Sequence, residues 1–109
     1  MVYSKLLALR IRHFFSDFDH IEEKKMFGGI GFMLGGHLCV GVWKTSLIVR
    51  LGPERAEVAI EERFVVEFDI TGRPMRGWAL VEAEGVETDE LLAKWIGQAV
   101  DFVQTLPPK

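Results

Sequence analysis

The sequence contains a single cysteine, Cys39, so no disulfide can form within one chain. This excludes the small secreted domains that depend on disulfide frameworks, and it favours a reducing compartment. A long apolar run is also missing, because the longest uncharged stretch, Met26–Trp43, is interrupted by six glycines and one histidine. Lys5, Arg10 and Arg12 break the N-terminal apolar segment before it reaches the length of a signal peptide. We therefore expect a cytoplasmic protein that does not span a membrane.

An excess of positive charge is absent as well. The chain has 13 Lys and Arg residues against 16 Asp and Glu residues, which gives a net charge of -3. Residues 1–25 are mildly basic and residues 80–109 are acidic, and neither segment forms a basic stripe along a helix. Proteins that bind DNA usually present such a stripe to the phosphate backbone. We therefore do not expect this chain to bind DNA directly.

Large apolar side chains are what the chain has in quantity. Hydrophobic residues make up 49% of the 109 residues, and they include eight Phe and three Trp. This composition excludes a disordered chain, and the length is typical of a single domain, here spanning residues 1–109. A domain of this size buries only about 65% of its unfolded surface. Some large apolar groups should therefore lie near the surface, at a dimer interface or in an apolar groove.

The first half of the chain shows two hydrophobic periods. Residues 4–18 have apolar side chains at three- and four-residue spacing, which predicts a helix with Ser4 as its N-cap. In residues 29–34, 38–43 and 47–51, a set of Ile, Leu, Val and Phe side chains occupies every second position, as in β-strands. Turns are expected at Gly35-Gly36 and Lys44-Thr45. The pattern predicts a three-stranded antiparallel meander, with the charged residues 24–25 as an exposed approach to it.

The second half predicts two more strands between two helices. Pro53 suits the first position of a short helix, whose inner face would be formed by Ala56, Ala59 and Ile60. Alternation returns in residues 64–70, which predicts a half-exposed strand, and residues 78–81 form its partner after a turn. Thr88 is placed to cap the final helix. The apolar stripe of that helix consists of Leu92, Trp95, Ile96, Ala99, Val103 and Leu106.

The resulting order is α-β-β-β-α-β-β-α. It predicts an α+β fold of two layers, in which helices cover one face of a five-stranded antiparallel sheet. The second face of the meander is also apolar or small, because it would carry Met33, Cys39, Gly41, Trp43 and Ile48. A sheet face with so little charge should not stand fully in water. We therefore expect a homodimer in solution.

Three segments carry a resemblance to a known family. They are Met26–Leu34 (Met-Phe-Gly-Gly-Ile-Gly-Phe-Met-Leu), Gly72–Trp78 (Gly-Arg-Pro-Met-Arg-Gly-Trp) and the C-terminal Leu106–Lys109. In this order and at this separation they resemble the N-terminal domain of the TfoX (Sxy) competence regulators, in its short stand-alone form. The resemblance runs from about Leu6 to Lys109. It implies an α+β layout and a role in competence-type transcriptional control through contacts with other proteins.

Two glycine- or lysine-containing segments could suggest nucleotide binding, but both lack essential features. Gly29-x-Gly31 has Leu34 where a dinucleotide fingerprint needs a third glycine, and it begins a strand instead of a helix. The Trp43–Ser46 segment lacks the upstream glycines of a phosphate-binding loop. These glycines are better explained by a β-bulge or by the close approach of another strand.

Other reactive side chains do not form a recognisable set. His37 and Cys39 supply two metal ligands where zinc needs three or four, and Cys39 fits a small buried apolar residue. Glu67 and Asp69 fit an exposed strand face better than an acid and base pair. No nucleophile, base and orienting group can be assembled. We therefore expect neither an enzyme nor a cofactor or metal site.

The best candidate for a functional surface is the turn from Gly72 to Trp78. A rigid turn would present two guanidinium groups beside an indole and a thioether, and such groups favour binding surfaces. The candidate partner or anion surface consists of Arg50, Arg73, Met75, Arg76 and Trp78. In the alternative, Trp78 is part of the core and the two turn arginines pair with acidic residues of the neighbouring strand. Two functions remain open: a regulatory protein-interaction module with a protein partner, or a small-ligand domain that binds anions.

Overall fold

The computed structural model describes residues 3–26, 28–69, 72 and 75–107. In this part of the chain it contains three α-helices, a short 3-10 helix and six strands. The elements follow one another as α1 (Lys5–Phe14), β1 (Ile21–Met26), β2 (Gly29–Leu34), β3 (His37–Trp43), β4 (Ser46–Arg50), α2 (Pro53–Ala59), β5 (Val65–Glu67), β6 (Trp78–Val81), η1 (Ala83–Val86) and α3 (Asp89–Val103).

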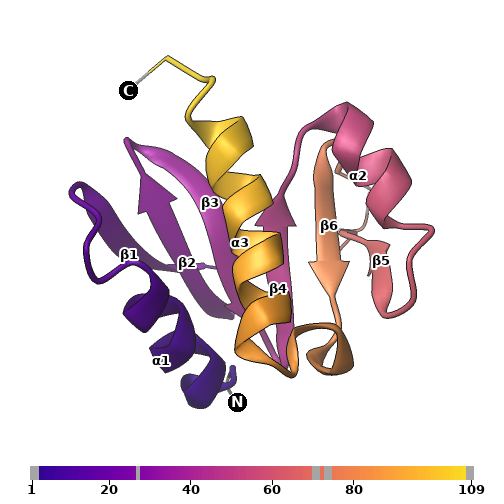
Figure 1. The fold of residues 1–109 in the computed structure, drawn as a ribbon, viewed down its shortest axis with the longest axis horizontal. Coiled ribbons are helices and arrows are strands. Elements are labelled where there is room, and N and C mark those ends of the chain that lie inside the picture. The colour runs from indigo at the N-terminus through magenta and orange to yellow at the C-terminus, as the bar shows by residue number, and fades with distance from the viewer. Residues whose placement is uncertain (1–2, 27, 70–71, 73–74, 108–109) are drawn as a thin grey trace.

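The strands form one antiparallel sheet in the order β1-β2-β3-β4-β6-β5. Figure 1 shows α1 and α3 lying across the same face of this sheet, which we call the helix face. The predicted α+β class and the helices on one face are therefore confirmed. The predicted number of strands is wrong, because the sheet has six strands and not five.

The additional strand is β1, at one edge of the sheet. Its sequence, Ile-Glu-Glu-Lys-Lys-Met, has four consecutive charged residues between two apolar ones, and the charged residues are all exposed. It pairs with β2 along its whole length, from Ile21 opposite Leu34 to Met26 opposite Gly29. An edge strand needs only one hydrogen-bonded neighbour and can bury few side chains. It therefore lacks the alternating pattern by which the other strands could be predicted.

A β-bulge changes which side chains of β3 point to each face of the sheet. Phe32 lies opposite Val40 and Met33 lies opposite Leu38, so Cys39 is an extra residue on β3. The predicted alternation, with Cys39 and Val40 on opposite sides of the strand, is therefore wrong. Both side chains are buried in the core on the helix face, where Cys39 packs as a small apolar residue.

The strand predicted for residues 64–70 is shorter than expected. It contains only Val65–Glu67. Phe64 has a φ angle of 69°, in the left-handed region, so the extended backbone begins one residue later, at Val65. Val65 is buried in the core, whereas Val66 is 42% exposed. Ile70 lies outside the described residues. The partner strand β6 has the predicted bounds, Trp78–Val81.

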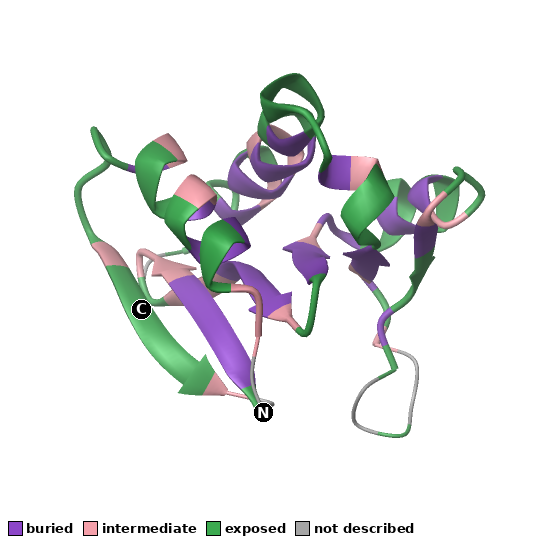
Figure 2. Cartoon of the chain, turned by 90° about the horizontal axis from the view of Figure 1, so that it is seen from below, coloured by how far each residue is buried: buried purple, intermediate pink, exposed green. Residues whose placement is uncertain are grey.

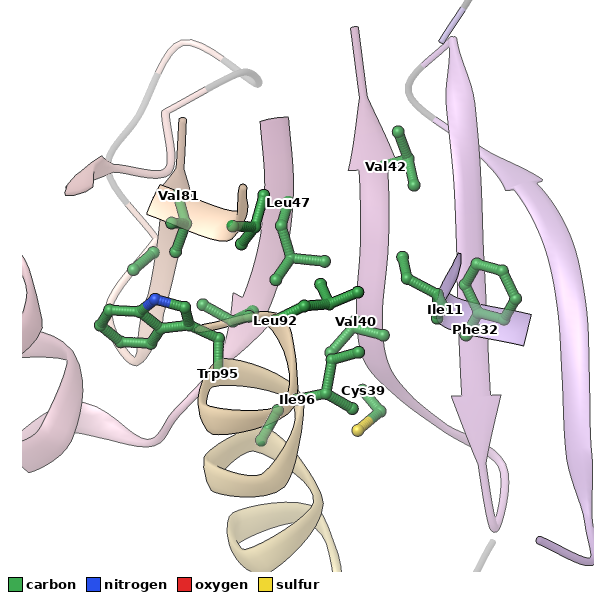
Figure 3. Close-up of a cluster of buried hydrophobic side chains, with 14 of the residues drawn as sticks. Ile11, Phe32, Cys39, Val40, Val42, Leu47, Val81, Leu92, Trp95 and Ile96 are labelled. Atoms are coloured by element: carbon green, nitrogen blue, oxygen red, sulfur yellow. The ribbon is translucent and has the colours of Figure 1, made fainter. Parts of the chain in front are cut away.

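The main core lies between the helix face and the two covering helices. Figure 3 shows Ile11 of α1 and Leu92, Trp95 and Ile96 of α3 among the buried side chains of the strands. The strand residues labelled there are Phe32, Cys39, Val40, Val42, Leu47 and Val81. Most of the predicted stripe of α3 is thus confirmed as core, although the helix ends at Val103, before Leu106.

Both predicted N-caps are present. The Ser4 hydroxyl accepts a hydrogen bond from the Leu7 amide at 3.1 Å, and the Thr88 hydroxyl accepts one from the Leu91 amide at 3.1 Å. Pro53 occupies the start of α2, whose Ala56 and Ala59 are buried as predicted. Helix α1 ends at Phe14, earlier than the predicted Phe18, which is 36% exposed.

Two glycine-to-alanine substitutions should distinguish a glycine that close backbone packing requires from a glycine that only weakens a helix. A Cβ on Gly29 would overlap the backbone carbonyl of Val42, whereas a Cβ on Gly97 of α3 would meet nothing within 4 Å. We expect Gly29→Ala to lower the free energy of unfolding by about 2 kcal/mol or more, because the β2–β3 backbones must move apart. The control, Gly97→Ala, should raise it by about 0.5–1 kcal/mol. Urea denaturation measures both, and equal stabilities would contradict the close approach.

A second prediction concerns the buried thiol. Burial raises the pKa of Cys39 to about 12, and the nearby Arg50 opposes this only in part. In the unfolded chain the thiol loses its proton near a pKa of about 8.5, so above that pH the unfolded state binds fewer protons than the folded state. The contribution of the Cys39 thiol to the free energy of unfolding should therefore fall as pH rises, and at pH 10 it should be about 2 kcal/mol lower than at neutral pH.

The measurement is the free energy of unfolding of wild type and Cys39→Ala between pH 7 and about pH 10. The substitution costs stability at every pH, but the wild type should lose more stability than the variant as pH rises. Parallel pH profiles would show that the folded thiol titrates like a free one.

Candidate functional site

The face of the sheet opposite α1 and α3, the back face, carries partly exposed apolar side chains. Strand register and alternation direct these side chains away from the core. Among the described residues no helix lies over the back face, and Figure 2 shows the helices gathered on the other side of the strands. We call the following set the back-face patch: Met26, Met33, Leu38, Trp43, Val66 and Trp78.

Glycines allow the patch to lie close to the strand backbone. A Cβ on Gly31 would come within 2.7 Å of the Leu38 Cδ1 atom and 2.9 Å of the Met26 sulfur. The two side chains therefore lie over the backbone of Gly31 and bury it. Gly41 is also buried, and a Cβ there would come within 2.8 Å of the carbonyl oxygen of Ile30. In the Met26–Leu34 segment, Gly29 and Gly31 thus serve close packing, as the sequence indicated, whereas a Cβ on Gly28 would meet nothing within 4 Å.

Next to the patch, a second and smaller hydrophobic cluster covers part of the back face. Its buried members are Ile48, Phe68 and Leu80, and Trp43, Met75 and Trp78 pack against them. The rings of Phe68 and Trp78 are 5.8 Å apart between centroids. Phe68 precedes the predicted turn and Met75 belongs to it, and both side chains pack on the back face of the sheet. The alternative in which Trp78 belongs to a core is therefore correct in part, because Trp78 keeps some exposure.

Backbone hydrogen bonds hold both ends of the turn. The Met75 amide donates to the Phe68 carbonyl at 2.9 Å, and the Gly72 amide donates to the Asp69 carbonyl at 2.9 Å. The Gly77 carbonyl accepts from Leu51 at 2.9 Å and from Gly52 at 3.0 Å, which ties the turn to the end of β4. Arg73 of the candidate surface and its neighbour Pro74 lie outside the described residues.

Arg50 is fixed by aromatic rings and not by an acid. Its guanidinium carbon lies 5.1 Å from the centre of the Trp78 ring and 5.8 Å from that of Phe102, near the end of α3. No carboxylate of the described residues lies within 4.0 Å of it. Cation–π contacts of this kind orient the guanidinium and leave its N–H groups without a fixed acceptor. The structure thus brings Arg50 and Trp78 together, as two members of one group.

Arg76 lies between two clefts. One, of about 540 Å³, is formed by the end of β4, the start of α2 and the end of α3. The other, of about 190 Å³, is formed by Met75, Trp78 and the side of α2. Arg76 is exposed and forms no ion pair within the described part of the chain, so the predicted pairing with Glu67 or Asp69 is wrong for this arginine.

The larger cleft also contains negative charge. Arg55 and Asp101 form an ion pair of 3.8 Å, and Glu54 lines the same cleft. Phe102, which lines this cleft and contacts Arg50, was not identified from the sequence. It stands three residues after Ala99 and seven after Trp95, at the helical spacing of the apolar stripe, and it packs against the core. Hydrophobic periodicity therefore carried a signal for Phe102, although not for its contact with Arg50.

The remaining candidate side chains lie elsewhere. The ring nitrogen Nε2 of His37 is 2.6 Å from the carbonyl oxygen of Pro107, so this histidine contacts the C-terminal segment. Cys39 is buried on the helix face. Within the described ranges there is no group of three or more metal-ligating side chains. None of the helices described is long and apolar enough to cross a membrane.

Comparison with known proteins identifies the family. Residues 13–103 match the TfoX N-terminal domain. Comparison with curated proteins and with solved structures gave no significant match. The matched segment contains β1 to β6, the whole of α3 and the whole back-face patch, so it includes every feature of the candidate surface. Because the match covers most of the 109 residues, the chain belongs to the TfoX N-terminal domain family.

Proposed function

We propose that this protein is a regulatory protein-interaction module of the competence-regulator type, which works by binding and not by catalysis. The observation that carries the proposal is the uncovered back-face patch, where Trp43, Trp78 and Met33 remain partly exposed. In this proposal the partner is a protein, the module acts in the cytoplasm, and it does not contact DNA itself.

The residue types of the patch support this function. Trp, Met and Arg are enriched where proteins bind one another, since large rigid or adaptable side chains bury much area at a low entropy cost. Arg50 stacks on Trp78 at 5.1 Å, so its planar group is oriented before any partner arrives. Side chains that are already ordered lose little freedom on binding. A partner that presents apolar groups and a carboxylate would match both parts of this surface.

A charge placed on the patch should prevent binding of the partner without unfolding the domain. We expect Met33→Asp to reduce recovery of the specific partner at least about tenfold, because a carboxylate would be buried against apolar groups. The control is Val58→Asp on α2, a side chain that is 66% exposed and lies outside the patch. The measurement is affinity capture from native cells with quantitative mass spectrometry, together with the melting temperature of each variant. Equal recovery by both folded variants would remove the back face from consideration.

A second candidate function is the binding of a small anionic ligand. The observation that favours it is Arg76, which is exposed beside two clefts and forms no ion pair with a described residue. Glu54 and Asp101 line the larger cleft and would oppose an anion there. For this reason the interaction module is the function we favour.

Citrate can serve as the probe for the anion function. If the function is present, citrate should raise the melting temperature of wild type and have a smaller effect on Arg76→Ala, because a ligand that binds only the folded state stabilises it. The matched control is Arg63→Ala, another exposed arginine, which lines neither cleft. The same citrate response in wild type and in both variants would count against a site at Arg76.

A further inference from the structure

The edge strand β1 has a neighbour on one side only. It is the first strand in the order of the sheet, and its four central residues are exposed. Figure 1 shows it at the margin of the sheet, beside α1. The four exposed residues of β1, Glu-Glu-Lys-Lys, carry two negative and two positive charges. We propose that β1 pairs antiparallel with β1 of a second copy of this chain, so that the two sheets form one continuous sheet.

Symmetry restricts how two such edges can meet. Two identical edges pair antiparallel about a two-fold axis that is perpendicular to the sheet. This axis leaves the helix faces of both copies on the same side, so a residue on the helix face must lie opposite another residue on that face. The axis therefore lies midway between two copies of the same residue, so that one residue of β1 lies directly opposite itself. Near the middle of β1 the possible centres are Glu23 and Lys24.

Charge favours the register centred on Glu23. Glu22 then lies opposite Lys24 of the second copy, and Lys24 lies opposite the second copy's Glu22, which gives two cross-strand pairs of opposite charge on the back face. The two Glu23 side chains meet on the helix face. Each is already held by Arg12 of α1 through hydrogen bonds of 2.7 and 2.9 Å, so its charge is compensated.

The other register is less favourable. Centred on Lys24, it would place the two lysines directly opposite each other, and like charges in that position are destabilising. Among the described residues no carboxylate lies within 4.0 Å of Lys24 to compensate its charge. This register would also form two pairs of opposite charge, between Glu23 and Lys25 of the second copy, so the two registers differ in their central like-charge pair. Arg12 compensates Glu23 in each copy, and this difference favours the Glu23 register.

Pairing in this way has a consequence for binding. The perpendicular axis directs the back faces of both copies to the same side, so two back-face patches would lie on one continuous surface. A partner that contacts both patches would bind more tightly than one patch allows. This consequence rests on the proposed function, whereas the pairing of β1 does not.

Charge reversal tests the pairing directly. An interface of this size is weak, so the dimer must be sought at high protein concentration. At about 100 μM, wild type should have twice the mass of the 12.4 kDa monomer in analytical ultracentrifugation. Glu22→Lys and Lys24→Glu each turn both cross-strand pairs into like-charge pairs, and each should raise the dimer Kd about 10- to 100-fold. An equimolar mixture of the two variants should dimerise again, because opposite charges then face each other.

Controls make each outcome decisive. Glu67→Lys on β5, at the opposite edge of the sheet, should keep the wild-type Kd. Melting temperatures show that each variant is folded, and amide hydrogen exchange in β1 should slow as protein concentration rises. A wild type that stays monomeric at about 100 μM would overturn the proposal. A dimer that persists in both single variants, or a mixture that stays monomeric, would also overturn it. Partner capture is a separate measurement, so these failures would leave the proposed function standing.

Discussion

The packing of α1 and α3 against one face of the sheet is the interaction on which the rest of the structure depends. The side chains buried there come from both helices and from the middle strands, and they form one continuous core. Because the chain buries its main apolar surface on one side of the sheet, the register of each strand is fixed by which residues point to that side. The same arrangement leaves the back face without a helical cover, so it also creates the surface from which we infer function.

The back face combines a structural and a binding character. Phe68 and Met75 pack over part of it and bury Ile48 and Leu80, so these side chains beside the turn contribute to the stability of the fold. Beyond this cluster the glycines of β2 and β3 keep the surface flat, and methionine and tryptophan side chains remain partly exposed. The guanidinium of Arg50 contacts Trp78 of the back face and Phe102 of α3. A surface that is ordered and apolar, with one oriented cation, suits recognition of another protein.

Several elements could be predicted because their signals are local. The N-caps at Ser4 and Thr88, the start of α2 at Pro53 and the strand Trp78–Val81 all agree with the structure. The errors share a different cause. Strand β1 has no buried face and therefore no alternation, and the bulge at Cys39 inserts a residue that a strict period of two cannot represent. Of the candidate surface, the grouping of Arg50 with Trp78 was predicted, but the contribution of Phe102 was not.

The sequence by itself determined the family, the α+β class and the type of most elements, because hydrophobic period, caps and turn residues act over a few neighbouring positions. Only the tertiary structure decided which strand lies at the edge, which face remains open and which rings hold Arg50. These features depend on pairings between segments far apart in the chain, such as β4 with β6 and Arg50 with Phe102. The free energy of such pairings comes from burial and register shared by many residues, and no local window of sequence contains that information.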